Sequence, residues 1–147
     1  MQNQLYPCLW FDGKAKEAAT FYCTVFKNSK ITVDTPMVVN FEINGQKFMG
    51  LNGGPMFRFN EAVSFVIDCA DQAEVDYYWD TLTADGGEES MCGWVKDKYG
   101  VSWQVVPLEL GKMMSAGDPK KGNAMMQALL KMKKLDIAGL KAAYEAG

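Results

Sequence analysis

The residues that could carry chemistry are limited by one absence, because the 147-residue chain contains no histidine. A Ser-His-Asp triad, a Cys-His pair, a histidine general base and a histidine metal ligand are therefore excluded. Acid–base or nucleophilic catalysis would have to use carboxylates, tyrosine, lysine, cysteine or backbone groups. The sequence thus restricts the reaction classes without naming a reaction.

Four cysteines, Cys8, Cys23, Cys69 and Cys92, are the candidate nucleophiles. They form no Cys-X-X-Cys motif, so the sequence indicates neither a zinc ribbon nor a redox dithiol. We expect reduced thiols in a cytoplasmic protein, since the N-terminus shows no secretory leader. Their ordinary role is that of small apolar core side chains. Cys92 would instead be reactive if Lys96 lay close enough to lower its pKa.

Charge is distributed unevenly along the chain, whose net charge is −3. Residues 1–108 carry eight basic and 14 acidic side chains, whereas residues 109–147 carry seven basic and four acidic ones. Nucleic acid is not an expected partner of this acidic body, because phosphate binding needs clustered lysine and arginine. A membrane is not expected either, since no apolar run reaches the roughly 18 residues that cross a bilayer.

The hydrophobic pattern predicts one order of elements that occurs twice. The first series is a strand, a helix and three strands at Leu5–Phe11, Lys14–Phe26, Lys30–Val33, Val38–Ile43 and Lys47–Leu51. The second series lies at Ala62–Asp68, Gln72–Ala84, Glu88–Met91, Gly93–Asp97 and Val101–Val106. Asn44-Gly45 predicts a type I′ hairpin turn, because both positions tolerate positive φ. Asp71 is the candidate N-cap of the second helix.

The two series align at an offset of 57 residues, which places Phe21-Tyr22 on Tyr78-Trp79. Two βαβββ modules can pair into a curved mixed sheet with a cleft for a small ligand. We therefore predict an α+β fold with a single domain over residues 1–107, built from modules at about 1–55 and 60–107.

Residues 108–147 are predicted to form a helical C-terminal extension. Leu108–Ser115 predicts a short helix, and Asp118-Pro119 is a typical helix start, with aspartate as N-cap and proline in the first position. Asp136 is the candidate N-cap of a last helix. The extension could pack on its own domain or cover a partner subunit, and both alternatives stay open at this point.

Several segments together carry a family resemblance. They are Leu9–Gly13, Ala18–Tyr22, Phe26–Ser29, Phe41–Gln46, Leu51–Pro55, Cys92–Gln104 and Met132–Ile137. Over nearly its whole length the chain resembles the PhnB-like group of the vicinal-oxygen-chelate superfamily, which includes glyoxalase I and bleomycin-resistance proteins. Members of that group often carry the name 3-demethylubiquinone-9 3-methyltransferase-like. The resemblance implies the glyoxalase/bleomycin-resistance fold and a homodimer in which two chains build each cleft.

Metal enzymes of that superfamily hold a divalent ion through one ligand on the first strand and one on the last strand of each module. The resemblance puts the matching positions of this chain near Pro7, at Gly50 or Asn52, near Ser64 and on Gln104. None of these side chains is a good ligand for a divalent transition metal. We therefore expect no catalytic metal and no cofactor.

The methyltransferase name needs support of its own. A typical site for S-adenosylmethionine uses a glycine-rich turn from a strand to a helix. Gly53-Gly54-Pro55 instead leads from a predicted strand into a loop, and Asp85-Gly86-Gly87 follows a predicted helix. The residues therefore do not support methyltransferase activity.

Alternate positions on the predicted strands would line the cleft of this fold. The candidate ligand-binding residues are Trp10, Phe48, Asn52, Ser64, Cys92, Trp94 and Gln104, with Phe65 and Trp103 as further aromatic candidates. Strand alternation lets only one of Trp103 and Gln104 face the cleft, and the resemblance favours Gln104. Aromatic walls with amide and hydroxyl groups suit a flat, neutral small molecule, although the same rings could simply form the core.

Three functions fit these observations. One is a dimeric protein that binds a small molecule without turning it over. Another is a metal-independent enzyme on a small organic substrate, with tyrosine, cysteine or a carboxylate as acid or base. A buried carboxylate or thiol facing the cleft would favour that enzyme. The third is a scaffold whose extension serves association only. We favour the small-molecule-binding protein.

Overall fold

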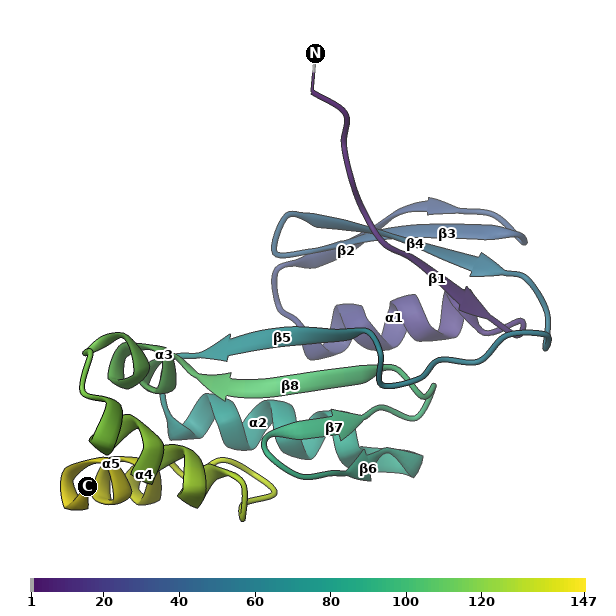
Figure 1. Ribbon diagram of the computed structural model, residues 1–147. Helices are drawn as coiled ribbons and strands as arrows, with labels where there is room; N and C mark the ends of the chain where they lie inside the picture. Colours follow the sequence, from purple (N-terminus) through teal and green to yellow (C-terminus); the bar gives the residue numbers. More distant parts are fainter. Residues whose placement is uncertain (1) are drawn as a thin grey trace. The chain divides into compact units, whose positions relative to one another are not determined.

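The computed structural model describes residues 2–147, which form two compact units. The first unit ends at Phe59, and the second runs from Asn60 to Gly147. Each unit contains a four-stranded mixed sheet and a helix packed on it, and the predicted βαβββ order is confirmed in both (Figure 1). Among the helices of residues 2–147, none has the length and apolar character needed to cross a membrane.

The first unit consists of β1 (Cys8–Phe11), α1 (Ala15–Val25), β2 (Ser29–Asp34), β3 (Val38–Ile43) and β4 (Gln46–Asn52). Its strand order is β1-β4-β3-β2, with β1 and β4 parallel and the other neighbours antiparallel. The turn between β3 and β4 has φ of 50° at Asn44 and 82° at Gly45. Positive φ at both positions is what the predicted hairpin requires.

The core of the first unit lies between its sheet and α1. The rings of Phe41 and Phe48 are buried there and stack with their centroids 5.2 Å apart. Tyr22 of α1 is fully buried, with its ring centroid 5.8 Å from that of Phe41. The residue before α1 makes no side-chain cap, and Asn52 of β4 takes its place by accepting a hydrogen bond of 2.9 Å from Ala15 N.

The second unit begins with β5 (Ser64–Cys69), α2 (Gln72–Thr83), the 3₁₀ turn η1 (Ala84–Gly86), β6 (Glu88–Glu89), β7 (Trp94–Lys96) and β8 (Ser102–Pro107). Its strand order is β5-β8-β7-β6, which repeats the arrangement of the first unit. Asp71 caps α2 as predicted, by accepting a hydrogen bond of 2.9 Å from Glu74 N. Trp79 of α2 is buried as Tyr22 is in α1, in agreement with the 57-residue offset.

A buried carboxylate organises the turn between β7 and β8. Asp97 is 2% exposed, and its Oδ1 accepts hydrogen bonds from Tyr99 N at 2.8 Å and Val101 N at 3.1 Å. Its Oδ2 accepts a hydrogen bond of 2.9 Å from the indole Nε1 of Trp103. The turn and the Trp103 ring, which lies 5.4 Å from that of Phe65, are therefore held together.

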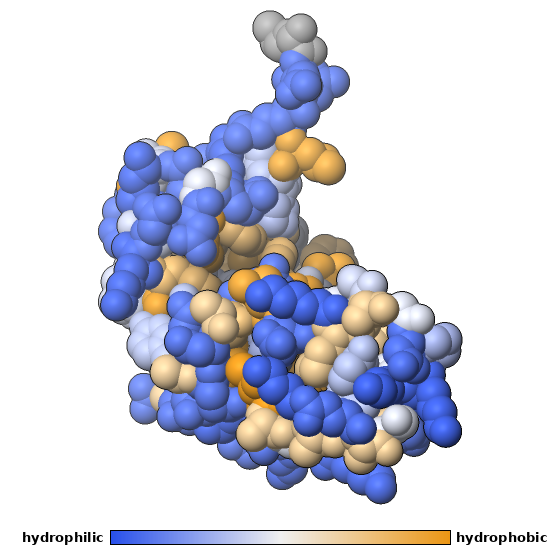
Figure 2. All heavy atoms as spheres, turned by 90° about the vertical axis from the view of Figure 1, so that its left-hand side faces the viewer, coloured by the Kyte–Doolittle hydropathy of each residue, from blue (hydrophilic) through white to orange (hydrophobic). Residues whose placement is uncertain are grey.

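The C-terminal extension folds as part of the second unit and forms α3 (Leu108–Ser115), α4 (Pro119–Leu129) and α5 (Ile137–Ala146). Its own small core consists of Met113, Met125, Leu129, Leu135 and Leu140. The outer surface at this end carries mainly hydrophilic residues with apolar ones between them (Figure 2). Asp118 caps α4 as predicted, by accepting a hydrogen bond of 3.2 Å from Lys121 N.

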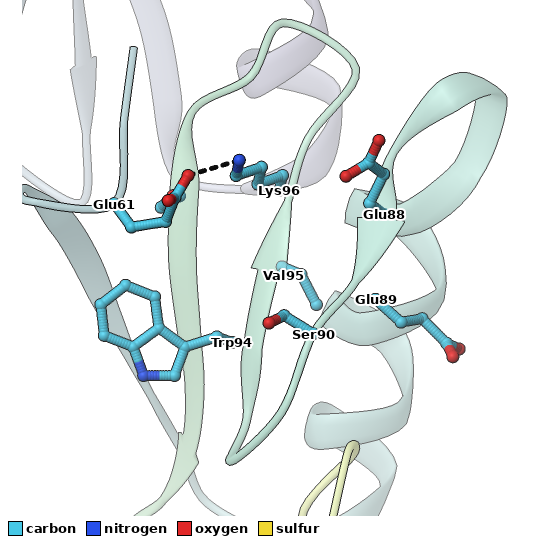
Figure 3. A pocket seen from close by; sticks show the side chains of 8 residues that line it. Glu61, Glu88, Glu89, Ser90, Trp94, Val95 and Lys96 are labelled. Carbon is cyan, nitrogen blue, oxygen red and sulfur yellow. Dashed lines mark ion pairs between the residues drawn. The ribbon is translucent and has the colours of Figure 1, made fainter.

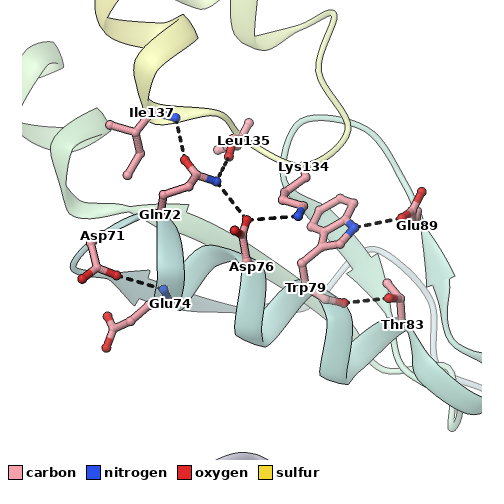
Figure 4. A network of polar contacts seen from close by, with 10 residues as sticks. All are labelled: Asp71, Gln72, Glu74, Asp76, Trp79, Thr83, Glu89, Lys134, Leu135 and Ile137. Atoms are coloured by element: carbon pink, nitrogen blue, oxygen red, sulfur yellow. Dashed lines mark hydrogen bonds and ion pairs between the residues drawn. The ribbon is translucent and has the colours of Figure 1, made fainter.

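A glutamine of α2 provides the cap of α5 (Figure 4). Gln72 Oε1 accepts a hydrogen bond of 2.9 Å from Ile137 N, and Gln72 Nε2 donates one of 3.1 Å to Leu135 O. The predicted cap by Asp136 is wrong, since its side chain makes no capping hydrogen bond. Gln72, 65 residues earlier in the chain, instead satisfies the N–H group of the first helical residue, Ile137.

Two further contacts hold the extension to its own unit. Lys134 forms an ion pair of 3.0 Å with Asp76 of α2, and Cys92 N donates a hydrogen bond of 2.8 Å to Met132 O. The hydrogen bond from Gln72 and the ion pair with Lys134 lower the pKa of the Asp76 carboxyl. The extension therefore packs against the rest of its own unit.

Replacing Asp97 tests whether its carboxylate maintains this unit. The Asp97→Ala substitution should lower the free energy of unfolding by about 3 kcal/mol, because it leaves buried N–H donors without a partner. Urea unfolding followed by circular dichroism measures the change. The matched control is Asp68→Ala at an exposed position of β5, which should change it by less than about 0.5 kcal/mol. Equal effects of both substitutions would contradict the assigned role.

Candidate functional site

The sheet of the second unit packs on α2 with one face, and within this unit we call the opposite face the open face. The α2 side carries the buried side chains of Val95, Trp103 and Val105. Because side chains alternate along a strand, Trp94, Lys96, Ser102 and Gln104 lie on the open face. Gln104 is therefore on the open face and Trp103 in the core, as strand alternation requires.

A first row of side chains on the open face combines an aromatic ring with polar groups. Gln104 of β8 is in register with Val66 of β5 on one side and Trp94 of β7 on the other. Its Nε2 donates a hydrogen bond of 2.9 Å to Ser64 Oγ. That bond leaves the amide oxygen of Gln104 and the hydroxyl hydrogen of Ser64 for a ligand.

A second row is charged. Ser102 is in register with Ser64 and Lys96, and Lys96 is in register with Glu88 of β6. Lys96 forms an ion pair with Glu61, from the segment before β5 (Figure 3). The hydrogen bond from Lys96 holds the pKa of Glu61 below its usual range, and the bond to Glu61 raises the pKa of Lys96. Both groups are therefore charged at neutral pH.

These charged groups line a pocket of about 230 Å³ together with Trp94 and Ser102. Ser102 is 1% exposed, and its Oγ has no hydrogen-bond partner among residues 2–147. A buried polar group without a partner costs about 1–3 kcal/mol. A ligand in this pocket would supply the missing partner.

The open face of the first sheet carries another candidate, Trp10. Its Nε1 donates a hydrogen bond of 2.8 Å to Gly54 O, and its ring meets that of Phe57 edge to face at 5.0 Å between centroids. A Cβ atom on Gly53 would overlap the indole of Trp10, so only glycine allows the loop to approach this closely. The loop after β4 thus already contacts the Trp10 indole, which leaves less of the ring for a ligand.

The remaining predicted site residues lie elsewhere. Phe48 is 6% exposed and belongs to the core under α1. Asn52 uses both ends of its amide within the first unit, accepting from Ala15 N and donating to Pro36 O at 2.9 Å. Cys92 packs against the core of the extension rather than beside Lys96, which is paired with Glu61. Of the seven predicted residues, the structure brings Ser64, Trp94 and Gln104 together.

Sequence reasoning missed Glu61, Glu88 and Ser102 as site residues and considered Lys96 only as a neighbour of Cys92. A signal existed for Ser102 and Lys96, because each is two positions from a predicted site residue on the same strand. Glu61 lies outside the strands, and its pairing with Lys96 depends on how the segment before β5 folds. No local pattern predicts such a pairing.

The residues at the family's metal positions do not fit a metal ion. Ser64 and Gln104 are a hydroxyl and an amide bonded to each other, and Asn52 is committed to Ala15 and Pro36. A divalent transition metal prefers imidazole, thiolate or carboxylate. Within the described chain, no group of three or more such side chains is placed to hold an ion.

Buried titratable groups also lie away from the open face. Asp97 is fully engaged in the β7–β8 turn. Cys69 is completely buried at the end of β5, and burial is the main cause that raises its pKa to about 12. A thiol with such a pKa is a poor nucleophile at neutral pH.

The chain was compared with family models and with curated proteins. Residues 3–106 match the model described as 3-demethylubiquinone-9 3-methyltransferase. No curated protein shows significant similarity to the chain.

Among solved structures, a PhnB protein from Bacillus cereus, described as a candidate 3-demethylubiquinone-9 3-methyltransferase, is 30% identical with a TM-score of 0.64. That match covers 71% of this chain and 99% of the relative. A glyoxalase-related enzyme from Fulvimarina pelagi is 15% identical with a TM-score of 0.56, over 74% of this chain and 91% of that one. The fosfomycin resistance protein FosX from Listeria monocytogenes, solved with Mn(II) and sulfate, is 14% identical with a TM-score of 0.54. That match covers 73% of this chain and 90% of FosX. The last two establish the fold alone.

Thiol labelling tests the assignment of Cys69 as an inert core residue. At pH 8 a thiol of pKa about 12 is ionised in roughly one molecule in ten thousand, so Cys69 should resist iodoacetamide in the folded protein. The exposed Cys8 should react first, as read by mass spectrometry of peptides. The control is the same reaction in urea, where both should react alike. Labelling of folded Cys69 as fast as Cys8 would refute the assignment.

Proposed function

The chain belongs to the 3-demethylubiquinone-9 3-methyltransferase family, and we propose that it binds a small organic molecule on the open face of its second sheet without a metal ion. One observation carries the proposal. Trp94, Gln104 and Ser64 lie together beside a pocket of about 230 Å³ that contains a buried hydroxyl without a partner. Concave sites with an aromatic wall and a few polar groups are typical of small-molecule binding.

Each of these side chains has a definite part in the proposed binding. Trp94 is half-buried and offers its ring to a flat portion of the ligand. Gln104 contributes an acceptor and Ser64 a donor, since their mutual hydrogen bond uses the opposite groups. Two fixed polar points beside a ring would orient the ligand.

The metal of FosX is not transferred to this chain in our proposal. Where a metal site would need imidazole or carboxylate, this chain has the amide of Gln104, which is hydrogen-bonded to the hydroxyl of Ser64. The residues do not fit the ion, so no step of the proposed function depends on one.

We do not propose methyltransferase activity, although the family is named for it. Gly53 and Gly54 follow β4 and lead toward β5. Gly86 is the last residue of η1, and Gly87 connects η1 to β6. In the described part of the chain, neither glycine pair lies in a turn from a strand to a helix, where a phosphate- or cofactor-binding glycine motif is expected. A metal-independent enzyme is also less well supported, because Asp97 and Cys69 do not face the open side.

We propose further that the protein is a cytoplasmic homodimer. Leu108, Met114 and Leu130 of the extension are 45%, 50% and 54% exposed, and a second copy would cover them. The four cysteines are free, which suits a reducing compartment and can be checked by cell fractionation.

An NMR titration with indole, a flat neutral probe, tests the binding site. Indole added to the ¹⁵N-labelled full chain should shift amide signals of β7 and β8. The Trp94→Ala variant should bind about fivefold more weakly, because it loses an aromatic contact of about 1 kcal/mol.

The matched control is Tyr77→Ala on α2, an exposed aromatic residue whose loss should leave indole binding unchanged. Mn(II) added instead of indole should broaden no particular set of amide signals. Indole shifts confined to other elements, or a saturable Mn(II) site on β5 and β8, would contradict the proposal.

Light scattering after size-exclusion chromatography tests the dimer. The wild type should show twice the chain mass of 16.3 kDa, and Met114→Lys combined with Leu130→Lys should reduce it to the single-chain value, because two charges would enter the apolar contact. Lys112→Ala on α3 is the control and should stay dimeric. A wild type that is monomeric at every concentration would refute the proposed dimer.

A further inference from the structure

We propose that the pocket beside Trp94 recognises a protonated amine, so that the ligand of the open face is a small organic cation. This inference rests on the proposed function, since it names the chemical class of the molecule bound at the same face. It also replaces the neutral ligand expected from the sequence, which was deduced without Glu61, Glu88 and Ser102. Three features of the pocket support a cation.

The first feature is the balance of charge. Glu61, Glu88 and Glu89 line the pocket together with a single cation, Lys96. Lys96 is paired with Glu61, and Glu89 accepts a hydrogen bond of 3.0 Å from the indole of Trp79 and points away from Lys96 (Figure 3). The side chain of Glu88 makes no hydrogen bond or ion pair within residues 2–147, although its charge acts on Lys96 and helps to raise the pKa of that lysine. A negative charge is thus left for a cationic ligand, whereas an anion would meet repulsion.

The second feature is the buried hydroxyl of Ser102. The residue is 1% exposed, lines the pocket, and finds no partner for its Oγ among the residues that the structure describes. Its neighbour across the strands is Lys96, in register on β7. An ammonium group has three N–H donors, so it can bond to Ser102 Oγ and still reach a carboxylate.

The third feature is the ring of Trp94. It lines the same pocket and is half-buried, so that one part of the ring can meet a ligand. The face of an indole attracts cations through its quadrupole, and tryptophan does so best among the aromatic side chains. Carboxylate, hydroxyl and indole together make a set of groups that an ammonium ion satisfies and that a carboxylate ligand does not.

Three probes of similar shape separate charge from shape: benzylamine, benzyl alcohol and benzoate. Each is titrated at millimolar concentration into the ¹⁵N-labelled full chain, with the Trp94 indole and the amides of Lys96 and Ser102 as reporters. Benzylamine should bind about tenfold more tightly than benzyl alcohol, because a charge-assisted hydrogen bond is the stronger kind. Benzoate should cause no shifts at these reporters.

Two variants test the named groups. Glu88→Gln should lower benzylamine affinity about tenfold and leave benzyl alcohol binding unchanged, while the control Glu145→Gln, at an exposed position of α5, should change neither. Ser102→Ala should also weaken benzylamine binding, yet unfolding should be unchanged or require more urea. A buried hydroxyl without a partner destabilises the fold, so its removal cannot harm stability as loss of a structural hydrogen bond would.

The outcomes distinguish the two proposals. Preference for benzylamine, lost in Glu88→Gln, supports the cation site. Equal binding of benzylamine and benzyl alcohol at these reporters overturns it and leaves small-molecule binding on this face standing. Preference for benzoate overturns it as well. No shift at the reporters with any of the three probes or with indole overturns both proposals.

Discussion

The buried carboxylate of Asp97 is the constraint on which the candidate site depends. It ties the β7–β8 turn to the indole of Trp103 through three hydrogen bonds. With Trp103 held on the α2 side, strand alternation sends Ser102 and Gln104 to the opposite face. A shift of one residue in β8 would bury Gln104 and expose Trp103. A buried side chain in the core thus determines which residues the open face presents.

The two units share the same order of strands, but different groups lie on the open faces of their sheets. In the first, the loop after β4 folds back on the open face, where Gly54 and Phe57 engage Trp10. In the second, Trp94 lies beside polar and charged side chains and a pocket. This face includes an unfavourable feature, because the hydroxyl of Ser102 is buried without a hydrogen-bond partner within residues 2–147. Buried polar groups in a well-packed core are normally hydrogen-bonded. Departures of this kind from good packing are common at functional sites.

The C-terminal extension contributes to the second unit through polar contacts as well as through its own apolar core. Gln72 bonds simultaneously to Leu135 and Ile137, and so joins the start of α2 to the start of α5. This clamp lies on the α2 side of the unit, whereas Trp94, Lys96 and Ser102 of the pocket lie on the open face of the sheet. Anchoring of the extension and binding at the pocket therefore use separate sets of residues.

Features that depend on near neighbours could be predicted from the amino-acid sequence: the βαβββ order, the Asn44-Gly45 turn and the cap by Asp71. Helical and strand periodicity, positive φ in a turn and an N-cap involve a few adjacent residues, so a single sequence contains them. Other features are visible only in the folded chain: Gln72 bonds to the start of α5, Glu61 pairs with Lys96, and Phe48 and Cys92 are packing residues. Each of these depends on contacts between segments far apart in the chain, whose partners are chosen by packing and burial rather than by local pattern.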